Sequence, residues 1–433
     1  MGLLRISVFG IGYVGTVTTA GLVRDGHEVI VVDVNREKIE KISQGLSPVL
    51  EPGVEELLSK AVQEGKLRAM MDTEEAVFSS EVSLICVGTP QAEQGGTDLT
   101  YVFKVCEDIG NAIRLKKQSQ VVVLRSTVPP GTAARCQELL SGMAGENKSY
   151  LVSNPEFLRE GTALIDFSES PYTVVGTEDP FAERVLREMY AGLQVPVLVV
   201  SPMVAEMIKY TANAWHAAKV AFANEIGRVS KRLGIHGGEV MDILVRDTKL
   251  NVSSAYMKPG FAFGGSCLPK DLEGLVRCAH DLSVPVPLLE SLKVSNDLQV
   301  DLAVAEVLRH KVRKVSVLGL AFKVGTDDLR ESPIVLLVKR LLGEGYQVRI
   351  YDEAVAKARL IGTNREYIQV HLPHFAELLT ANASAALESA ELVVLADRTP
   401  EATLALRQVP QGIPVVDLTD GLANGGDLSA RIQ

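Results

Sequence analysis

The chain has 433 residues, of which 46% are hydrophobic and 23% charged, with a formal net charge of −10. This composition is typical of a soluble globular protein, and at roughly 150 residues per domain the length predicts two or three domains. No run of about 18 apolar residues is present, so no membrane span is expected. The acidic charge argues against a nucleic-acid partner, but local basic groups and helix N-termini can still bind an anionic small molecule.

Cysteine usage and the first residues predict a reducing, cytoplasmic compartment. The cysteines include no C-x-x-C pair and are odd in number: Cys86, Cys106, Cys136, Cys267 and Cys278. This pattern argues against a disulfide framework and against structural zinc. The N-terminal residues enter a strand pattern at once, so no signal peptide is expected. His371 and His374 form an isolated H-x-x-H without a third ligand in view, and we predict no bound metal.

A dinucleotide-binding motif opens the chain. A short apolar strand at residues 4–10 leads into Gly10-Ile11-Gly12-Tyr13-Val14-Gly15, followed by a helix, a second strand and Asp33. Gly10 allows a tight turn, Gly12 lets the backbone approach a pyrophosphate, and Gly15 lets the helix pack on the strand. The helix N-terminus favours the phosphates. Asp33 is placed to bond a ribose hydroxyl, which favours NAD over NADP because a carboxylate repels a 2′-phosphate.

Strand and helix patterns continue to alternate through residue 200. Strand patterns occur at residues 82–87, 120–124, 151–153, 172–176 and 195–200. This alternation predicts a parallel, doubly wound sheet, in which ligands bind beyond the carboxyl ends of the strands. Thr89, Thr127 and Glu156 each follow a strand, so we expect them to face one crevice. Cys86 lies within a strand and is interpreted as a core residue.

A helical middle separates this region from a second α/β unit. Apolar residues recur at three- and four-residue steps from Met203 to Leu233, which predicts one long helix with Lys209 and Asn213 on a shared face. Residues 345–352 repeat the pattern of residues 26–33. We therefore predict an α/β fold with an NAD-binding Rossmann domain at 1–200, a helical central domain at 201–300, and a Rossmann-like nucleotide-sugar-binding domain at 301–433.

The helical middle contains a glycine-rich cysteine segment, Gly264-Gly265-Ser266-Cys267-Leu268-Pro269-Lys270-Asp271. Two consecutive glycines favour a sharp bend or a close approach of the backbone to something else. Cys267 then lies at a turn with an ammonium and a carboxylate in reach, a setting that favours the nucleophilic thiolate. The alternative from these residues alone is a glycine-rich loop with an inert cysteine.

The order of these motifs resembles the nucleotide-sugar 6-dehydrogenases, the family of the UDP-glucose and GDP-mannose dehydrogenases, over essentially the whole chain. The family markers are Gly10–Gly15, Val87–Pro90, Ser126-Thr127, Asn154–Glu160, Gly264–Cys267 with Lys270-Asp271, and Asp327–Pro333. Other stretches resemble the GDP-mannose subtype: Ala205–Thr211, Trp215–Gly227, Pro259–Phe263 and Gly325–Asp327. Lys258 departs from that subtype, which carries arginine there, and lysine lacks the bidentate fork. UDP-glucose or another UDP-sugar is therefore the alternative substrate.

The resemblance implies a four-electron oxidation of the sugar C6 hydroxyl, with two NAD reduced in turn. Cys267 is expected to capture the aldehyde as a thiohemiacetal, which becomes a thioester that water activated by Glu156 hydrolyses. Lys209 is expected to stabilise the oxyanion, and Asp271 to hold the water that acts as base. The implied catalytic set is Cys267, Lys209, Asp271, Glu156, Asn213 and Thr127.

The same resemblance implies the binding residues. For NAD they are Gly10, Gly12, Tyr13, Val14, Gly15, Asp33, Lys38, Thr89, Thr127 and Arg330. For the nucleotide sugar they are Glu160, Lys209, Asn213, His216, Asn224, Asn251, Tyr256, Lys258, Phe261, Gly264 and Lys323. A homodimer built on the long middle helix, or a higher homo-oligomer, is also implied, with no nucleic-acid or membrane partner.

Two functions from other classes compete with this interpretation. A catalytically silent nucleotide-binding protein would leave Cys267, Lys209, Asp271 and Glu156 without a role. A simple 3-hydroxyacid-type dehydrogenase shares the first domain, the helical middle and a Lys/Asn pair one helical turn apart. The cysteine segment and the second α/β unit argue against that simpler enzyme.

Overall fold

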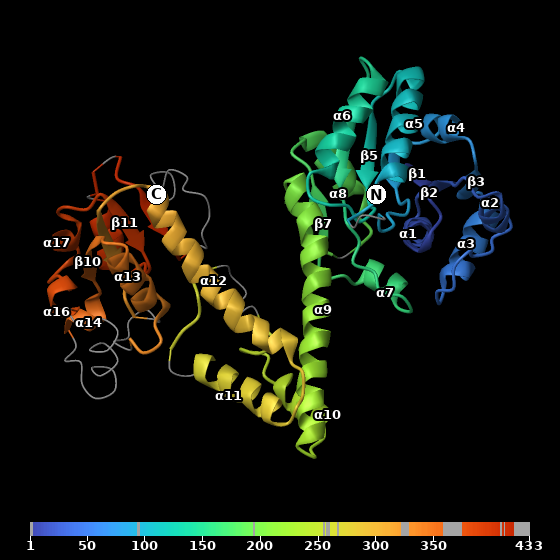
Figure 1. Ribbon diagram of the computed structural model, residues 1–433. Coiled ribbons are helices and arrows are strands. Elements are labelled where there is room, and N and C mark those ends of the chain that lie inside the picture. The colour runs from blue at the N-terminus through green and yellow to red at the C-terminus, as the bar shows by residue number, and fades with distance from the viewer. Residues whose placement is uncertain are drawn as a thin grey trace. The chain divides into compact units, whose positions relative to one another are not determined.

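The computed structural model describes residues 3–92, 96–193, 195–253, 256, 260–265, 268–321, 329–357, 375–407, 409–410 and 412–419 (Figure 1). The chain forms two compact units, Met1–Ala217 and Ala218–Gln433. The predicted long helix is confirmed as α9 (Pro202–Arg232), which contains the boundary between the units. Among the described helices, none has the length and hydropathy needed to cross a membrane.

The first unit is an α/β layer structure around an eight-stranded sheet of order β3-β2-β1-β4-β5-β6-β7-β8. Its strands are β1 (Arg5–Phe9), β2 (Glu28–Val32), β3 (Leu67–Met70), β4 (Val82–Ile85), β5 (Gln120–Leu124), β6 (Ser149–Ser153), β7 (Thr173–Gly176) and β8 (Val197–Val200). Its helices before α9 are α1 (Tyr13–Arg24), α2 (Arg36–Ser43), α3 (Val54–Gln63), α4 (Thr73–Phe78), α5 (Thr100–Lys116), α6 (Thr132–Ala144), α7 (Ala163–Ser168) and α8 (Pro180–Met189).

The predicted doubly wound, parallel sheet is confirmed, with one antiparallel pairing, between β6 and β7. Neighbouring strands from β3 through β2, β1, β4 and β5 to β6 pair in parallel. Strand β7 pairs antiparallel with β6 and parallel with β8. A strand that runs antiparallel to the preceding strand begins at the end of the sheet where that strand finished. The connection between β6 and β7 therefore begins and ends at the carboxyl edge of the parallel strands, and this connection carries Glu156 and α7.

Apolar side chains on both faces of the sheet form two separate cores. Ile6 and Val8 of β1 pack with residues of α1, α2, α3, α7 and α8. Phe9 of β1 belongs to the other core, with residues of α4, α5 and α6, and Figure 1 shows α5 and α6 alongside each other. A parallel sheet covered on both faces has near-continuous apolar strands, as β4 and β5 do here.

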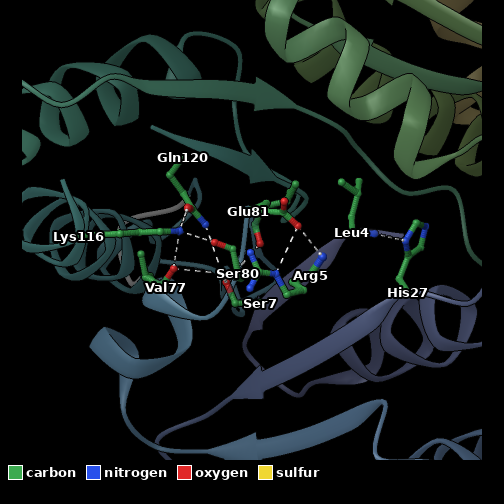
Figure 2. Close-up of polar contacts among 10 residues, drawn as sticks. Leu4, Arg5, Ser7, His27, Val77, Ser80, Glu81, Lys116 and Gln120 are labelled. Carbon is green, nitrogen blue, oxygen red and sulfur yellow. Dashed lines mark hydrogen bonds and ion pairs between the residues drawn. The ribbon is translucent and has the colours of Figure 1, made fainter. Parts of the chain in front are cut away.

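A polar cluster near the amino ends of β1 and β5 contrasts with these cores (Figure 2). Lys116 donates to the side chain of Gln120 and to the carbonyl of Val77, each at 2.9 Å. Ser80 donates to Ser7 at 3.0 Å. Burial lowers the pKa of Lys116, with a further contribution from the charge of Arg5. These bonds satisfy buried polar groups at the edge of the sheet opposite to the carboxyl ends.

The second unit combines helices with a four-stranded parallel sheet of order β10-β9-β11-β12. Its strands are β9 (Lys314–Leu318), β10 (Gln347–Tyr351), β11 (Leu392–Leu395) and β12 (Val415–Asp417). Its helices after α9 are α10 (Gly237–Leu244), α11 (Leu268–Asp281), α12 (Pro287–Arg309), α13 (Pro333–Gly343), α14 (Glu353–Lys357), α16 (Phe375–Leu378), α17 (Ala383–Leu387) and α18 (Pro400–Leu406).

The predicted repetition of the N-terminal pattern in the second unit is confirmed in its backbone. Gly10 and Gly319 both have φ of +96°. Each donates its backbone N–H at 2.8 Å to the carbonyl oxygen of the last residue of a neighbouring strand. That residue is Val32 in the first unit and Tyr351 in the second. The second unit is therefore Rossmann-like around β9, as the sequence indicated.

Candidate active site

The Gly10–Gly15 turn has the geometry that a dinucleotide requires. A Cβ on Gly10 would lie 2.9 Å from the Cα of Val87, and a Cβ on Gly15 would lie 1.9 Å from the carbonyl oxygen of Gly10. Nothing lies within 4 Å of the corresponding position on Gly12, which leaves open space in front of the turn. The turn and the first turn of α1 therefore fit a pyrophosphate, held by backbone N–H groups.

Asp33 closes this turn from the end of β2. Its Oδ2 accepts the backbone N–H of Ile11 at 2.7 Å, and its Oδ1 accepts that of Asn35 at 2.8 Å. Lys38 Nζ lies 3.7 Å from Oδ2. The carboxylate thus fixes the glycine turn, and it forms an ion pair with Lys38, the other predicted cofactor-binding residue at this end of β2.

Loops that follow β4 and β5 are joined at the carboxyl edge of the sheet. Thr89 donates its hydroxyl to the carbonyl of Thr127 at 3.0 Å, and Ser126 donates to the carbonyl of Val87 at 2.7 Å. These bonds bring Thr89 and Thr127 together, as expected for residues of one crevice. Cys86 is buried beneath them, and burial raises the pKa of its thiol to about 12, which is consistent with a core role.

Glu156 and Lys209 form a buried ion pair at this edge. The carboxylate of Glu156, after β6, lies 2.9 Å from Lys209 Nζ of α9, and both side chains are nearly inaccessible to solvent. Glu156 also accepts the backbone N–H of Leu158 at 2.6 Å. The ammonium lies 5.6 Å from the centroid of the Phe157 ring. The structure thus joins two residues that are far apart in sequence and that we predicted to be catalytic.

Other predicted residues of the first unit lie on the same two segments as this pair. Asn213, one turn after Lys209 on α9, is exposed, and so is His216. Glu160 is exposed on the segment after Glu156. Exposed polar side chains of this kind are available to a ligand.

A buried glutamate that we did not predict anchors the Thr127 loop to α9. Glu206 accepts the backbone N–H groups of Gly131 and Ala133, each at 2.6 Å. Burial raises the pKa of Glu206 against the opposing effect of these two hydrogen bonds. Because Glu206 precedes Lys209 by one helical turn, the same helix fixes both the Thr127 loop and the ammonium. The sequence signal that could have found it is a carboxylate within an otherwise apolar helical stripe.

The predicted residues Lys258, Cys267 and Lys323 lie outside the described residues, but the flanks of Cys267 are described. A Cβ on Gly264 would lie 2.3 Å from the carbonyl oxygen of Glu331, so only glycine permits this approach. Gly265 has φ of +87°, which also favours glycine. The Gly-Gly pair therefore permits both the close approach and the bend that the sequence indicated.

Two amides of α12, also missed in the sequence, hold the segment that leads into Gly264. Asn296 accepts the N–H of Phe263 at 2.8 Å and donates to its carbonyl at 3.0 Å. Gln299 donates to the carbonyl of Gly260 at 2.9 Å. Their three-residue spacing on a helix was the available signal, because it places both amides on one face.

The remaining predicted residues are all in the second unit. Asp271 lies in the first turn of α11 and is exposed, with its carboxylate 2.7 Å from Lys270 Nζ. Asn224, Asn251 and Tyr256 are exposed, Phe261 and Arg330 are half-buried, and Gly264 is buried. The described residues contain no group of three or more potential metal ligands, and His371 and His374 lie outside them.

Comparison with known proteins identifies the family from three successive matches. Residues 4–194 match the NAD binding domain of the UDP-glucose/GDP-mannose dehydrogenase family, residues 203–298 its central domain, and residues 316–416 its UDP binding domain. The chain belongs to the UDP-glucose/GDP-mannose dehydrogenase family. The N-terminal glycine turn is thus part of a family NAD-binding domain, and the resemblance seen in the sequence is confirmed.

Similarity to individual members extends over nearly the full length. The GDP-mannose 6-dehydrogenase of Pseudomonas putida is 46% identical over 434 residues, which are 99% of each chain. The crystal structure of a ternary complex of GDP-mannose dehydrogenase from Pseudomonas aeruginosa superimposes with a TM-score of 0.93 at 47% identity, covering 96% of both chains. A UDP-glucose 6-dehydrogenase of Bacillus subtilis is 36% identical over 366 residues, or 82% of this chain.

Proposed function

We propose that this member of the family is an NAD-dependent GDP-mannose 6-dehydrogenase that converts the C6 hydroxyl to a carboxylate with formation of two NADH. The observation that carries the proposal is the buried Glu156–Lys209 pair on the sheet edge that adjoins the glycine turn. The chain that contains this pair is 46% identical to a GDP-mannose 6-dehydrogenase over 99% of the length of this chain. UDP-glucose is the second candidate, supported by Lys258, but the UDP-glucose relative covers less of the chain at lower identity.

Each residue has a defined part in the proposed chemistry. NAD, when bound, accepts a hydride in each of the two oxidations. A water held by Asp271 takes the hydroxyl proton, and the Lys209 ammonium stabilises the developing alkoxide. A charge that is already fixed by Glu156 in a buried site needs little reorganisation when the alkoxide forms.

The second half of the reaction requires covalent capture. The Cys267 thiol adds to the C6 aldehyde, so that a C–S bond forms and the thiol proton moves to the new hydroxyl of the thiohemiacetal. Oxidation of that carbon gives a thioester. Glu156 then removes a proton from water, the water oxygen attacks the thioester, and the C–S bond breaks to release the acid and the thiol. Asn213 and Thr127 are assigned to hold water and substrate oxygens.

We also infer a homodimer in the cytoplasm. In helix α10, Val240 and Ile243 are exposed, Met241 and Leu244 are half-buried, and no residue is buried. Exposed apolar residues of this kind favour a protein partner. The family resemblance implies a homodimer built on the long helix α9, and we place α10, the next helix in the chain, in the same interface. The cysteines in the described part of the chain are free thiols, which supports a reducing compartment.

The direct test counts NADH formed per sugar nucleotide by the purified protein. Two NADH per GDP-mannose are expected, with UDP-glucose inert. Cys267→Ser should stop turnover after the first oxidation because a serine hydroxyl is a much weaker nucleophile than a thiolate. Cys278→Ser, at a half-buried cysteine of the same unit, is the matched control and should retain two NADH. Two NADH from UDP-glucose instead would overturn the substrate, and one NADH from the unaltered protein would overturn the role of Cys267.

A further inference from the structure

Glu51 lies between α2 and α3, is not among the site residues predicted from the sequence, and has only 7% of its surface exposed. Its carboxylate accepts three hydrogen bonds. Tyr13 Oη donates at 2.5 Å, and the backbone N–H groups of Gly161 and Ala163 each donate at 2.8 Å. Tyr13 belongs to the glycine turn, whereas Gly161 and Ala163 belong to the connection that carries Glu156. One carboxylate therefore joins the two halves of the site.

The protonation of this junction is fixed at neutral pH. Burial raises the pKa of Tyr13, and the neighbouring Glu51 raises it further, so the phenol stays a donor. Burial also raises the pKa of Glu51, but the bonds from Tyr13, Gly161 and Ala163 outweigh it and hold that pKa below its ordinary value. The junction is thus a charge-assisted set of bonds, which is stronger than a neutral set.

The connection from Asn154 to Gly161 is held at other points as well. Asn154 Oδ1 accepts from Arg125 Nη1 at 2.8 Å and from Tyr190 Oη at 2.5 Å. Near its far end, Arg159 pairs with Asp166 of α7 at 2.6 Å. A segment fixed at several points transmits a displacement at one of them to the others, because it has few ways to absorb it locally.

We propose that Glu51 is a positioning residue that couples the glycine turn to the segment carrying Glu156 and Glu160, so that a dinucleotide bound on the turn also orders this segment for the sugar nucleotide. The inference deepens the proposed function and rests on it for the identity of the sugar nucleotide. Coupling of this kind is reciprocal: a sugar nucleotide that contacts the segment also strengthens dinucleotide binding. Neither Glu51 nor Tyr13 needs to touch the reacting carbon.

The test isolates one bond of the junction. Tyr13→Phe removes the donor to Glu51 but keeps the ring, and Glu51 keeps its two backbone donors. Hydrogen exchange of peptides spanning residues 154–166 is measured without and with saturating NADH. In the unaltered protein NADH should slow this exchange by about fivefold or more, the lower end of typical allosteric coupling. In Tyr13→Phe the ratio of the exchange rates without and with NADH should fall close to one. Tyr101→Phe, at an exposed tyrosine of α5, should behave like the unaltered protein.

A second arm measures the coupling between ligands. NADH and GDP-mannose form a complex that cannot react, so the dissociation constant of GDP-mannose can be compared with and without NADH. The ratio should exceed about five in the unaltered protein and approach one in Tyr13→Phe. Equal protection by saturating NADH in both proteins, or no NADH effect in the unaltered one, would overturn the coupling. Normal protection in a protein that oxidises no GDP-mannose would instead retain the coupling and overturn the proposed function.

Discussion

Lys209 and Glu156 depend strongly on each other for stability because both side chains are buried. Removing one partner of a buried pair leaves an uncompensated charge, which costs more than the pair contributes. Catalysis adds a separate demand, since only the ammonium can stabilise an alkoxide. Stability and rate should therefore respond differently when the pair is removed stepwise.

We predict that Lys209→Met lowers kcat by about 10²–10³, the usual effect of losing one group that stabilises an oxyanion. It should also destabilise the protein by about 3–5 kcal/mol. The double variant Lys209→Met/Glu156→Gln should recover much of the stability, because no charge is left unpaired, but none of the rate. Steady-state kinetics and urea unfolding check both parts, with Lys231→Met, at an exposed lysine of the same helix, as control. A double variant as unstable as Lys209→Met would contradict this account.

Three helices obtain their N-terminal caps from distant glutamates. Glu51 accepts from the start of α7, Glu206 from the start of α6, and Glu225 from the N–H groups of Leu288 and Leu289 at the start of α12. None of these three helices has a side-chain cap from its own N-cap residue. Each glutamate satisfies backbone donors that have no partner within their own helix.

These caps mark the limit of prediction from sequence. Asn35, Asp72 and Asp179 cap α2, α4 and α8 from the adjacent position, a pattern that is readable in sequence. A cap supplied from another element depends on tertiary contacts, so the spacing of residues near the helix in the sequence does not predict it. The same reason explains the antiparallel β7, whose direction depends on where its connection runs rather than on its own residues.

Glu51 and Glu206 should contribute to stability with opposite pH dependence. The pKa of Glu51 is lowered, so its contribution is present above the ordinary glutamate pKa of about 4.3 and is lost as pH falls through the lower folded value. Burial raises the pKa of Glu206, so its contribution is present below about 4.3 and is lost as pH rises through the higher folded value. The difference has two causes: Glu206 is more deeply buried than Glu51, and Glu51 accepts a third bond, from Tyr13.

Urea midpoints from pH 3.5 to 7 for the unaltered protein, Glu51→Gln and Glu206→Gln check this prediction. The loss of stability in Glu51→Gln should grow with pH, and that in Glu206→Gln should shrink. Glu56→Gln, at an exposed glutamate of α3, is the control and should show little effect at any pH. Parallel trends in the two buried variants would show that both carboxylates titrate alike.

At the scale of the whole molecule, the motifs with strict backbone demands were the most predictable. The Gly10 turn, the long helix α9 and the repeated pattern around Gly319 and Asp352 all follow from residue types at fixed spacing. The rule that ligands bind beyond the carboxyl ends of strands placed Glu156 at this end of the sheet, whereas Lys209 on α9 was grouped with it only through the family resemblance. Asp271, Asn224 and Tyr256 lie in the other compact unit, and local patterns carry no information on how residues of two units approach a substrate.

The proposed dimer interface includes exposed apolar residues of α10. Ile243 of α10 is 71% exposed and Val240 is 39% exposed, while the helix buries none of its residues in the chain to which it belongs. Burying such side chains against a second copy stabilises association, and a charge placed there is costly to bury. Ile243→Glu should therefore halve the mass measured by sedimentation. Glu239→Gln, at an exposed polar position of the same helix, should leave the mass unchanged. A dimer that persists in Ile243→Glu would place the interface away from α10, because a buried unpaired carboxylate there would not be tolerated.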